Sequence, residues 1–250
     1  EVKTLRRRLH HFEGFGRAAE LMRELARDRM PEYDGPSRVV QVDGHQLVYH
    51  GKEKIGEVFS SRCKKVVRAE TDNWVSLPGG FPLMVVTCEF NQALSRVLPE
   101  ILEATRRELG LQRLCCCFDR GGYNVLLFEQ LIDAGFDIIT YRKGGYDALP
   151  ERCFPEGPVT VNARTYPRGL SDRTVELKVY APVDHGPGKK LGRRDTGRTL
   201  QLREIRALRK DGGQTAILTS CSTAQRSAEK VAGLLFDRIG SQENVFKYLR

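Results

Sequence analysis

The stretch that decides the fold is residues 114–143, LCCCFDRGGYNVLLFEQLIDAGFDIITYRK. It opens with an unbroken apolar run at 114–118, which ends at Asp119 and two glycines and is typical of a buried strand that feeds a tight turn. A helical pattern follows at 126–134, and a second short apolar run covers 136–141. Strand, helix and strand at this spacing predict parallel strands joined by a crossover helix.

The residues before this stretch predict antiparallel strands. Apolar or β-branched runs at 39–42, 63–67 and 82–90 are typical of a meander, and Trp74 between them is expected in a polar loop. A helix is predicted over 92–109. The expected fold class is therefore α/β, with a mixed sheet, antiparallel first and parallel later, flanked by helices.

We divide the chain into four segments. Residues 1–36 predict a basic helical segment with a linker, and 37–143 the first part of the core. Residues 144–221 are rich in turns and alternating runs, which indicates a β-rich insertion, and 222–250 predict a last helix opened by a capping box at Ser222-x-x-Gln225. Because the chain starts without methionine and stops inside a helical pattern, we expect a piece of a longer protein.

Composition narrows the class of protein. With 40% hydrophobic and 29% charged residues among 250, the chain is typical of a globular protein and not of a disordered or fibrous one. No apolar run approaches the ~20 residues of a membrane helix, and no signal peptide opens the chain, so we expect a cytosolic protein without membrane contact. Seven cysteines, three of them consecutive, favour reduced thiols over disulfides or a zinc site. The net charge of +9 favours a polyanionic partner, nucleic acid before anionic membrane.

Three acids stand where an acid is costly. Asp43 and Asp119 each follow an apolar strand, and Glu243 falls on the apolar stripe of the last helix. Each alone is read more simply as a capping or salt-bridged acid, but three that converge would repel one another unless they bound a cation. Oxygen ligands favour Mg²⁺ or Mn²⁺, and two such ions suit phosphodiester chemistry.

Four strings around these acids resemble bacterial insertion-sequence DDE transposases, which have a ribonuclease H-like catalytic domain. They are VDGHQLVYHGK at 42–52, CFDRGGYNVLLFEQL at 117–131, DIITYRKG at 137–144 and DRIGSQENVFKYLR at 237–250. The resemblance implies Asp43, Asp119 and Glu243 as the catalytic, metal-binding triad, and a β-rich insertion before the last catalytic helix. The chain departs from the expected pattern at Gly240 and Ser241, which we expect to interrupt that helix.

Six residues are candidates for DNA contacts, with solvated surface charge as the simpler alternative. The glycines after Arg120 permit a close approach to a phosphate, and 141–143 follow a strand at the same sheet edge. Lys247 lies about one turn beyond Glu243. The candidates are Arg120, Tyr141, Arg142, Lys143, Arg238 and Lys247.

The leading hypothesis is therefore an Mg²⁺-dependent enzyme that cleaves DNA and transfers strands during transposition of an insertion sequence. Its expected partner is double-stranded DNA, both transposon ends and target, bound by a homodimer in the bacterial cytoplasm at the nucleoid. Two alternatives stay open: an inactive DNA-binding transposase remnant, and a ribonuclease H-like nuclease that cuts without joining.

Overall fold

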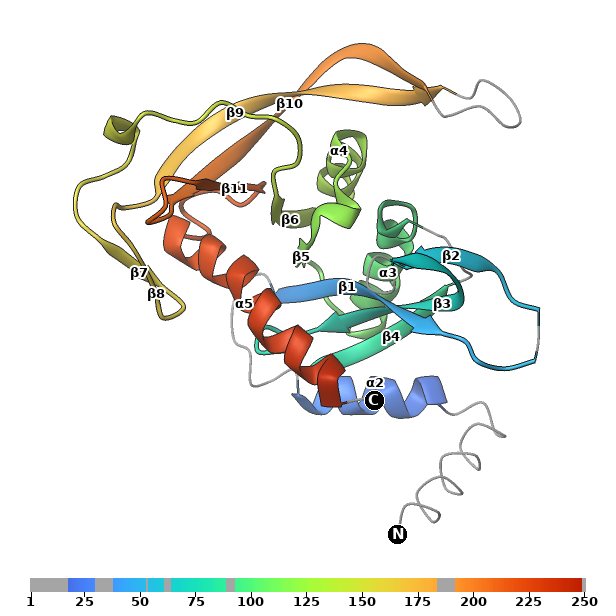
Figure 1. Ribbon diagram of the computed structural model, residues 1–250. Helices are drawn as coiled ribbons and strands as arrows, with labels where there is room; N and C mark the ends of the chain where they lie inside the picture. Colours follow the sequence, from blue (N-terminus) through green and yellow to red (C-terminus); the bar gives the residue numbers. More distant parts are fainter. Residues whose placement is uncertain are drawn as a thin grey trace.

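The structure is a computed structural model (Figure 1). It describes residues 18–29, 38–52, 54–60, 64–88, 93–183 and 192–248, with the backbone alone at 18, 19, 29, 88 and 239–248. The helices are α2 (Ala18–Arg29), α3 (Leu94–Glu108), α4 (Val125–Asp133) and α5 (Ala228–Tyr248), with short 3-10 turns η2 (Arg120–Gly122) and η3 (Glu151–Cys153). The strands are β1 (Arg38–Val48), β2 (Glu57–Ser60), β3 (Lys65–Ser76), β4 (Pro82–Cys88), β5 (Leu114–Phe118), β6 (Phe136–Tyr141), β7 (Val159–Val161), β8 (Arg164–Tyr166), β9 (Ser171–Val183), β10 (Gly192–Leu208) and β11 (Gln214–Thr219).

One mixed sheet of nine strands organises the described residues. Its order is β2-β3-β1-β5-β6-β11-β10-β9, with β4 paired to β3. The pairs β1–β3 and β3–β4 are antiparallel, β1–β5 and β5–β6 are parallel, and β6–β11, β11–β10 and β10–β9 are antiparallel again. The expected α/β fold, with a mixed sheet flanked by helices, is confirmed.

Helices cover both faces of this sheet (Figure 1). Alternation along the strands divides the core, because neighbouring side chains point to opposite faces. Val40 and Cys116 pack in the cluster that contains α3 and α4, whereas Val39, Cys115 and Cys117 pack in the cluster that contains α5. The three consecutive cysteines are therefore buried strand residues, and the five cysteines whose side chains the structure describes are free thiols.

The prediction of a polar loop around Trp74 was wrong. Trp74 lies inside the long strand β3, opposite Asp43 of β1 and Val85 of β4. The Thr87 hydroxyl donates to Oδ1 of Asp72 at 2.7 Å across the β3–β4 pair. Pairing on both sides thus holds a polar stretch in a strand, although its local composition favours a loop.

The residues predicted as a β-rich insertion, 144–221, extend the main sheet. Strand β11 pairs with β6, and β10 and β9 follow it, so these strands continue the core; β7 and β8 form a separate two-stranded sheet. Strands β9 and β10 also pair beyond the edge of the main sheet as a long hairpin, which lies at the top of Figure 1 and extends past α4.

The last helix differs from its prediction in two ways. The capping-box bonds form, since Ser222 N donates to Gln225 Oε1 at 2.7 Å and Gln225 N donates to Ser222 Oγ at 3.3 Å, but they close a turn ahead of the helix. Helix α5 begins at Ala228, where Ser227 Oγ accepts from Lys230 N at 3.2 Å. Its backbone is helical through residues 240–241, so the expected interruption is absent.

The amino-terminal prediction is described in part. Of the predicted basic helices, α2 is described and packs against β4, where Val85 N donates to the sulfur of Met22 at 3.4 Å. Residues 1–17 and 30–37, the latter including the predicted linker at 31–37, lie outside the described residues. None of the described helices has the length and apolar character to cross a membrane.

Candidate active site

Two acids meet at the carboxyl edge of the parallel strands. The β1–β5 register ends at Val42 opposite Phe118, so Asp43 and Asp119 are the next residues on neighbouring strands. Burial raises the pKa of Asp43 above its ordinary value, and the negative charge of Asp119 raises it further, although Arg238 opposes both. We call Asp43 and Asp119 the edge carboxylates.

A tight turn fixes the carboxylate of Asp119. Its Oδ1 accepts from Gly121 N at 2.7 Å and caps η2. A Cβ at position 121 would lie 2.8 Å from that oxygen, which explains the glycine there. From the next strand, Thr140 Oγ1 donates to the Asp119 carbonyl at 3.3 Å. The turn uses one of the two carboxylate oxygens and holds the group at the sheet edge.

Helix α5 brings an arginine onto Asp43. Arg238 Nη1 lies 3.0 Å from Asp43 Oδ1, and the Arg238 side chain is 9% exposed. Two further bonds fix the helix across β1 and the β3–β4 turn: Gln41 Nε2 donates to Leu234 O at 3.2 Å, and Gly79 N donates to Asp237 Oδ2 at 2.7 Å. The predicted candidate Arg238 thus lies at the predicted acid Asp43.

The third predicted acid is placed by its backbone only. Glu243 lies on α5 five residues after Arg238, in a helix that runs unbroken between them. The side chains of Glu243 and Lys247 are outside the described residues, so their roles stay predictions. Within the described part of the chain, no group of three His, Cys, Asp or Glu side chains has the arrangement of a metal site.

The other predicted DNA contacts lie near this edge. Arg120 is exposed on η2, and its guanidinium carbon lies 5.8 Å from the ring centroid of Tyr141, the last residue of β6. Burial raises the pKa of Tyr141 above its ordinary value, with Arg238 acting in the opposite direction. Lys143 is exposed. Arg120 therefore lies over the half-buried ring of Tyr141 directly beside Asp119, while Arg238 pairs with Asp43.

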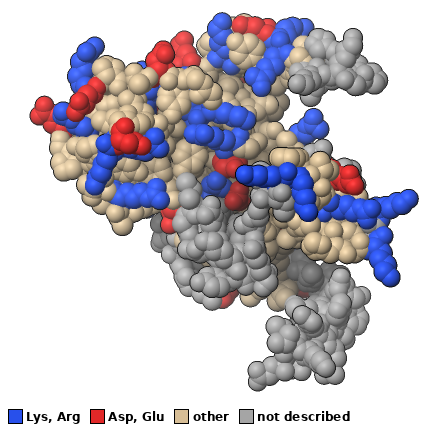
Figure 2. Space-filling view, viewed as in Figure 1, with Lys and Arg blue, Asp and Glu red and all other residues tan. Residues whose placement is uncertain are grey.

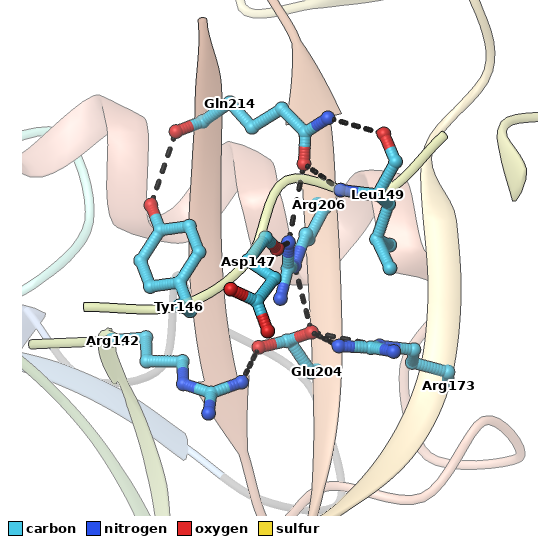
Figure 3. Close-up of polar contacts among 8 residues, drawn as sticks. All are labelled: Arg142, Tyr146, Asp147, Leu149, Arg173, Glu204, Arg206 and Gln214. Atoms are coloured by element: carbon cyan, nitrogen blue, oxygen red, sulfur yellow. Dashed lines mark hydrogen bonds and ion pairs between the residues drawn. The ribbon is translucent and has the colours of Figure 1, made fainter. Parts of the chain in front are cut away.

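Arg142 contacts a group of residues around Glu204 that the sequence analysis did not identify (Figure 3). Its Nη1 pairs with Oε1 of Glu204, a fully buried acid on β10. Oε2 of Glu204 accepts from Arg173 Nε at 2.9 Å and from Arg206 Nε at 2.8 Å. We call Glu204, Arg142, Arg173 and Arg206 the Glu204 cluster. A signal was present in the sequence, because the charged Glu204 and Arg206 alternate with the apolar Ile205 and Ala207 at the end of β10.

Cations dominate the surface around these sites. Figure 2 shows Lys and Arg side chains spread from the β9–β10 hairpin at the top to the β2–β3 strands at the right. Exposed basic residues that the structure describes on these elements and the loops beside them include Lys52, Lys54, Lys64, Lys65, Arg68, Arg173, Lys178, Arg193, Arg194 and Arg198. Exposed cationic side chains therefore lie at both ends of the main sheet, on β2–β3 and on β9–β10.

Comparisons with known proteins give one family. The model of a family described as "Transposase protein" matches residues 1–250. No curated protein matches the chain. Among solved structures, the chain is similar to piggyBac transposase in a synaptic complex with hairpin DNA, with 10% sequence identity and a TM-score of 0.44. That similarity covers 85% of this chain and 39% of the other, so the chain spans well under half of that protein's length.

Proposed function

The chain belongs to the transposase family whose model spans all its residues, and from this premise we propose that it is a DDE transposase of a bacterial insertion sequence. Its reaction is the metal-dependent cleavage of DNA and the transfer of the cut strand to a target. The observation that carries the proposal is the meeting of Asp43 and Asp119 at the carboxyl edge of β1 and β5, where the positive charge of Arg238 and Arg120 gathers.

The donors present fit a hard divalent cation. Asp43 and Asp119 offer carboxylate oxygens from adjacent strands, and the chemistry of Mg²⁺ and Mn²⁺ favours such ligands. The raised pKa of Asp43 supports the same assignment, because burial and like charge leave this carboxylate in need of a cation. We assign Asp43, Asp119 and Glu243 as the residues that hold Mg²⁺ or Mn²⁺, two ions in all.

The roles of the protein groups follow from their positions. Bound metal ions supply activation of the attacking oxygen and stabilisation of the leaving oxygen. The edge carboxylates set where the phosphodiester lies, while Arg120 and Arg238 offset its negative charge. Water attacks the phosphodiester at the DNA end first, and the bond to the 3′-oxygen breaks, which releases a 3′-hydroxyl. This hydroxyl then attacks a target phosphodiester and displaces the target's own 3′-oxygen, which takes up the proton; neither step forms a covalent bond to protein. The partners are two DNA ends and a target, brought together by a homodimer.

A second candidate function has one observation in its favour. The ion pair between Arg238 and Asp43 occupies Oδ1 of an assigned metal ligand with a protein cation. In a catalytically inactive DNA-binding protein such a pair is a permanent substitute for the metal. For the active enzyme, Arg238 would have to release Asp43 Oδ1 before that oxygen could hold a metal ion.

The test uses the purified chain and DNA that carries the terminal sequences flanking its gene, with Mg²⁺ or Mn²⁺. We expect nicked and strand-transfer products in wild type and none in Asp119→Asn, with DNA binding retained. Asparagine keeps the oxygen that accepts from Gly121, so the turn persists. Cleavage by Asp119→Asn refutes the assignment. Metal-dependent cuts without joined products point to a nuclease, and DNA binding without any product supports the inactive protein.

A further inference from the structure

The Glu204 cluster carries more positive charge than its acid neutralises. Three guanidiniums meet one buried carboxylate, and hydrogen bonds from Arg206, Arg142 and Arg173 outweigh burial and lower the pKa of Glu204 below its ordinary value, so the acid is ionised at neutral pH. The cluster therefore keeps an excess of two positive charges. Arg206 is 1% exposed, Arg142 19% and Arg173 41%, so this charge extends from the interior to the surface.

A cavity of about 290 Å³ opens beside these arginines. Its lining comprises Arg142, Gly145, Tyr146, Asp147, Leu149, Arg173 and Arg206. Since a water molecule occupies roughly 30 Å³ of the liquid, the cavity has room for a phosphate group with some of its hydration. Asp147 is the second acid there, and in the described part of the chain no ion pair joins its carboxylate to the arginines (Figure 3).

The arginines are held in place before any ligand arrives. Arg206 Nη1 donates to Asp147 O at 2.6 Å and to Gln214 Oε1 at 3.2 Å, and its guanidinium carbon lies 4.6 Å from the Tyr146 ring centroid. The Arg142 guanidinium carbon lies 5.6 Å from the same ring. Gln214 also accepts from Leu149 N at 3.0 Å and donates to Leu149 O at 2.7 Å, which closes the loop over the cavity. Donors fixed in this way lose little conformational entropy when they bind an anion.

The cavity lies beside the candidate active site. The β5–β6 register pairs Phe118 with Thr140, so Asp119 and Arg142 emerge at the same sheet edge. Strand β10, which carries Glu204, is three strands from β5 in the sheet order. At ~4.8 Å per strand this separation is roughly 14 Å, comparable to the ~12 Å width of the DNA major groove. The side chains of Asp43 and Glu204 point to opposite faces of the sheet, because Val42, next to Asp43, and Leu202, two residues before Glu204, both pack in the cluster that contains α3 and α4. A duplex that contacts both the edge carboxylates and the cavity therefore crosses the sheet edge from one face to the other.

We propose that this cavity, the arginine pocket, binds a backbone phosphate of the DNA that lies across the sheet edge at Asp43 and Asp119. The inference rests on the proposed function, because it takes the phosphate from DNA. Arg173 is the residue that approaches the phosphate from the surface, and Arg142 and Arg206 complete the pocket. The ionised Glu204 acts as a positioning residue, because it orients the three guanidiniums without touching the ligand.

The test measures binding of a short fluorescein-labelled duplex to the full chain by anisotropy, in EDTA, over a series of KCl concentrations. We expect Arg173→Gln to weaken binding about 5- to 10-fold near 0.1 M salt and to reduce the slope of log K against log salt by about one. Asp147→Asn removes a competing carboxylate and strengthens binding about 2-fold. The control Arg107→Gln deletes the same charge from an exposed position on α3 and leaves the affinity within about 2-fold of wild type.

Three results overturn the inference. The first is an Arg173→Gln affinity equal to that of Arg107→Gln, and the second is an Asp147→Asn affinity no higher than wild type. The third is Arg173-dependent binding of inorganic phosphate with unchanged DNA affinity, which marks a small-anion site. If Arg173→Gln does not fold, Asp147→Asn decides alone. Wild-type protein that binds no DNA removes the premise as well, whereas normal wild-type binding with insensitive variants refutes the arginine pocket and leaves the proposed function standing.

Discussion

The edge carboxylates and the Glu204 cluster are two charge clusters in which the balance of acidic and basic groups is opposite. Asp43 pairs with Arg238 but also lies near the negative charge of Asp119, and burial together with that charge raises the pKa of Asp43. Glu204 meets three arginines, and its pKa is lowered. Burial acts in the same direction on Asp43 and Glu204, so the number of cationic partners decides the sign.

The difference assigns the two acids different roles. Glu204 has enough cationic partners to stabilise the fold, whereas Asp43 has too few to offset its burial and the nearby charge of Asp119. Glu204 is fully supplied with donors, and its removal leaves buried arginines without their counter-charge. Asp43 is short of positive charge, which is the condition under which a carboxylate recruits a cation from solution. Variants at the edge carboxylates are therefore expected to change catalysis and metal binding, whereas variants in the Glu204 cluster are expected to change stability.

The largest effect is expected on catalysis at the edge carboxylates. Asp43→Asn removes an assigned metal ligand, and we expect metal-dependent DNA cleavage to fall by at least ~10²-fold, measured as initial rates of nicking. The melting temperature should change by only a few degrees, because relief of burial and of repulsion from Asp119 offsets the lost ion pair to Arg238. A collapse of the fold in this variant contradicts the comparison.

The second effect is on stability at the Glu204 cluster. Glu204→Gln leaves three guanidiniums around a neutral group, and we expect the free energy of unfolding to fall by about 3 kcal/mol in urea denaturation. Glu176→Gln is the matched control, since Glu176 is exposed on β9 and binds Gln201 Nε2 at 3.0 Å; its cost should be about 0.5 kcal/mol or less. Equal losses in the two variants would show that Glu204 has no special role.

The third prediction concerns acid. The folded pKa of Glu204 lies below its ordinary value of 4.5, so its contribution to stability is present above that value and is lost as pH falls through the folded pKa. We expect the gap in unfolding free energy between wild type and Glu204→Gln to be constant near neutral pH and to narrow below about pH 4.5. Urea titrations at a series of pH values measure the gap, and a gap that widens in acid contradicts the prediction.

The smallest effect is on metal affinity. Arg238→Gln removes the cation beside Asp43, and we expect the affinity for Mn²⁺ to rise about 3- to 10-fold in calorimetric titration, because the metal no longer competes with an arginine. Arg113→Gln, which deletes a charge before β5 and beside Asp137, should leave the affinity unchanged. A lower Mn²⁺ affinity in Arg238→Gln would mean that the arginine positions Asp43 for the metal.

Local patterns predicted the part of the fold that decides the site. The apolar run before Asp119, the helix behind it and the strand before Arg142 all form as the periodicity indicates, because continuous burial leaves a clear trace in composition. That the sheet places Asp43 beside Asp119 followed from the rule that parallel strands share a carboxyl edge.

Long-range contacts left no such trace. Trp74 lies in a strand because β1 and β4 pair on both sides of it, and no local pattern reports these partners. The same holds for Arg142. Its polar neighbours in the sequence indicate a surface residue, yet it forms an ion pair with Glu204 on β10, which is separated from β6 by β11 in the sheet. A charge within an alternating strand is a weak signal until the sheet order is known.

Strand β1 also sets a rule for which changes in chain length the protein tolerates. It pairs with β5 only over Arg38–Val42 and continues beside β3 to Val48. We call the point where β5 stops pairing with β1 the fork, and Asp43 is the first residue beyond it. One inserted or deleted residue between 38 and 43 turns the Asp43 side chain to the opposite face of the sheet, away from α5. Insertions in the connection from Tyr49 to Lys64, beyond the fork, leave that register intact. Homologues should therefore vary in length beyond the fork and keep a fixed spacing before it.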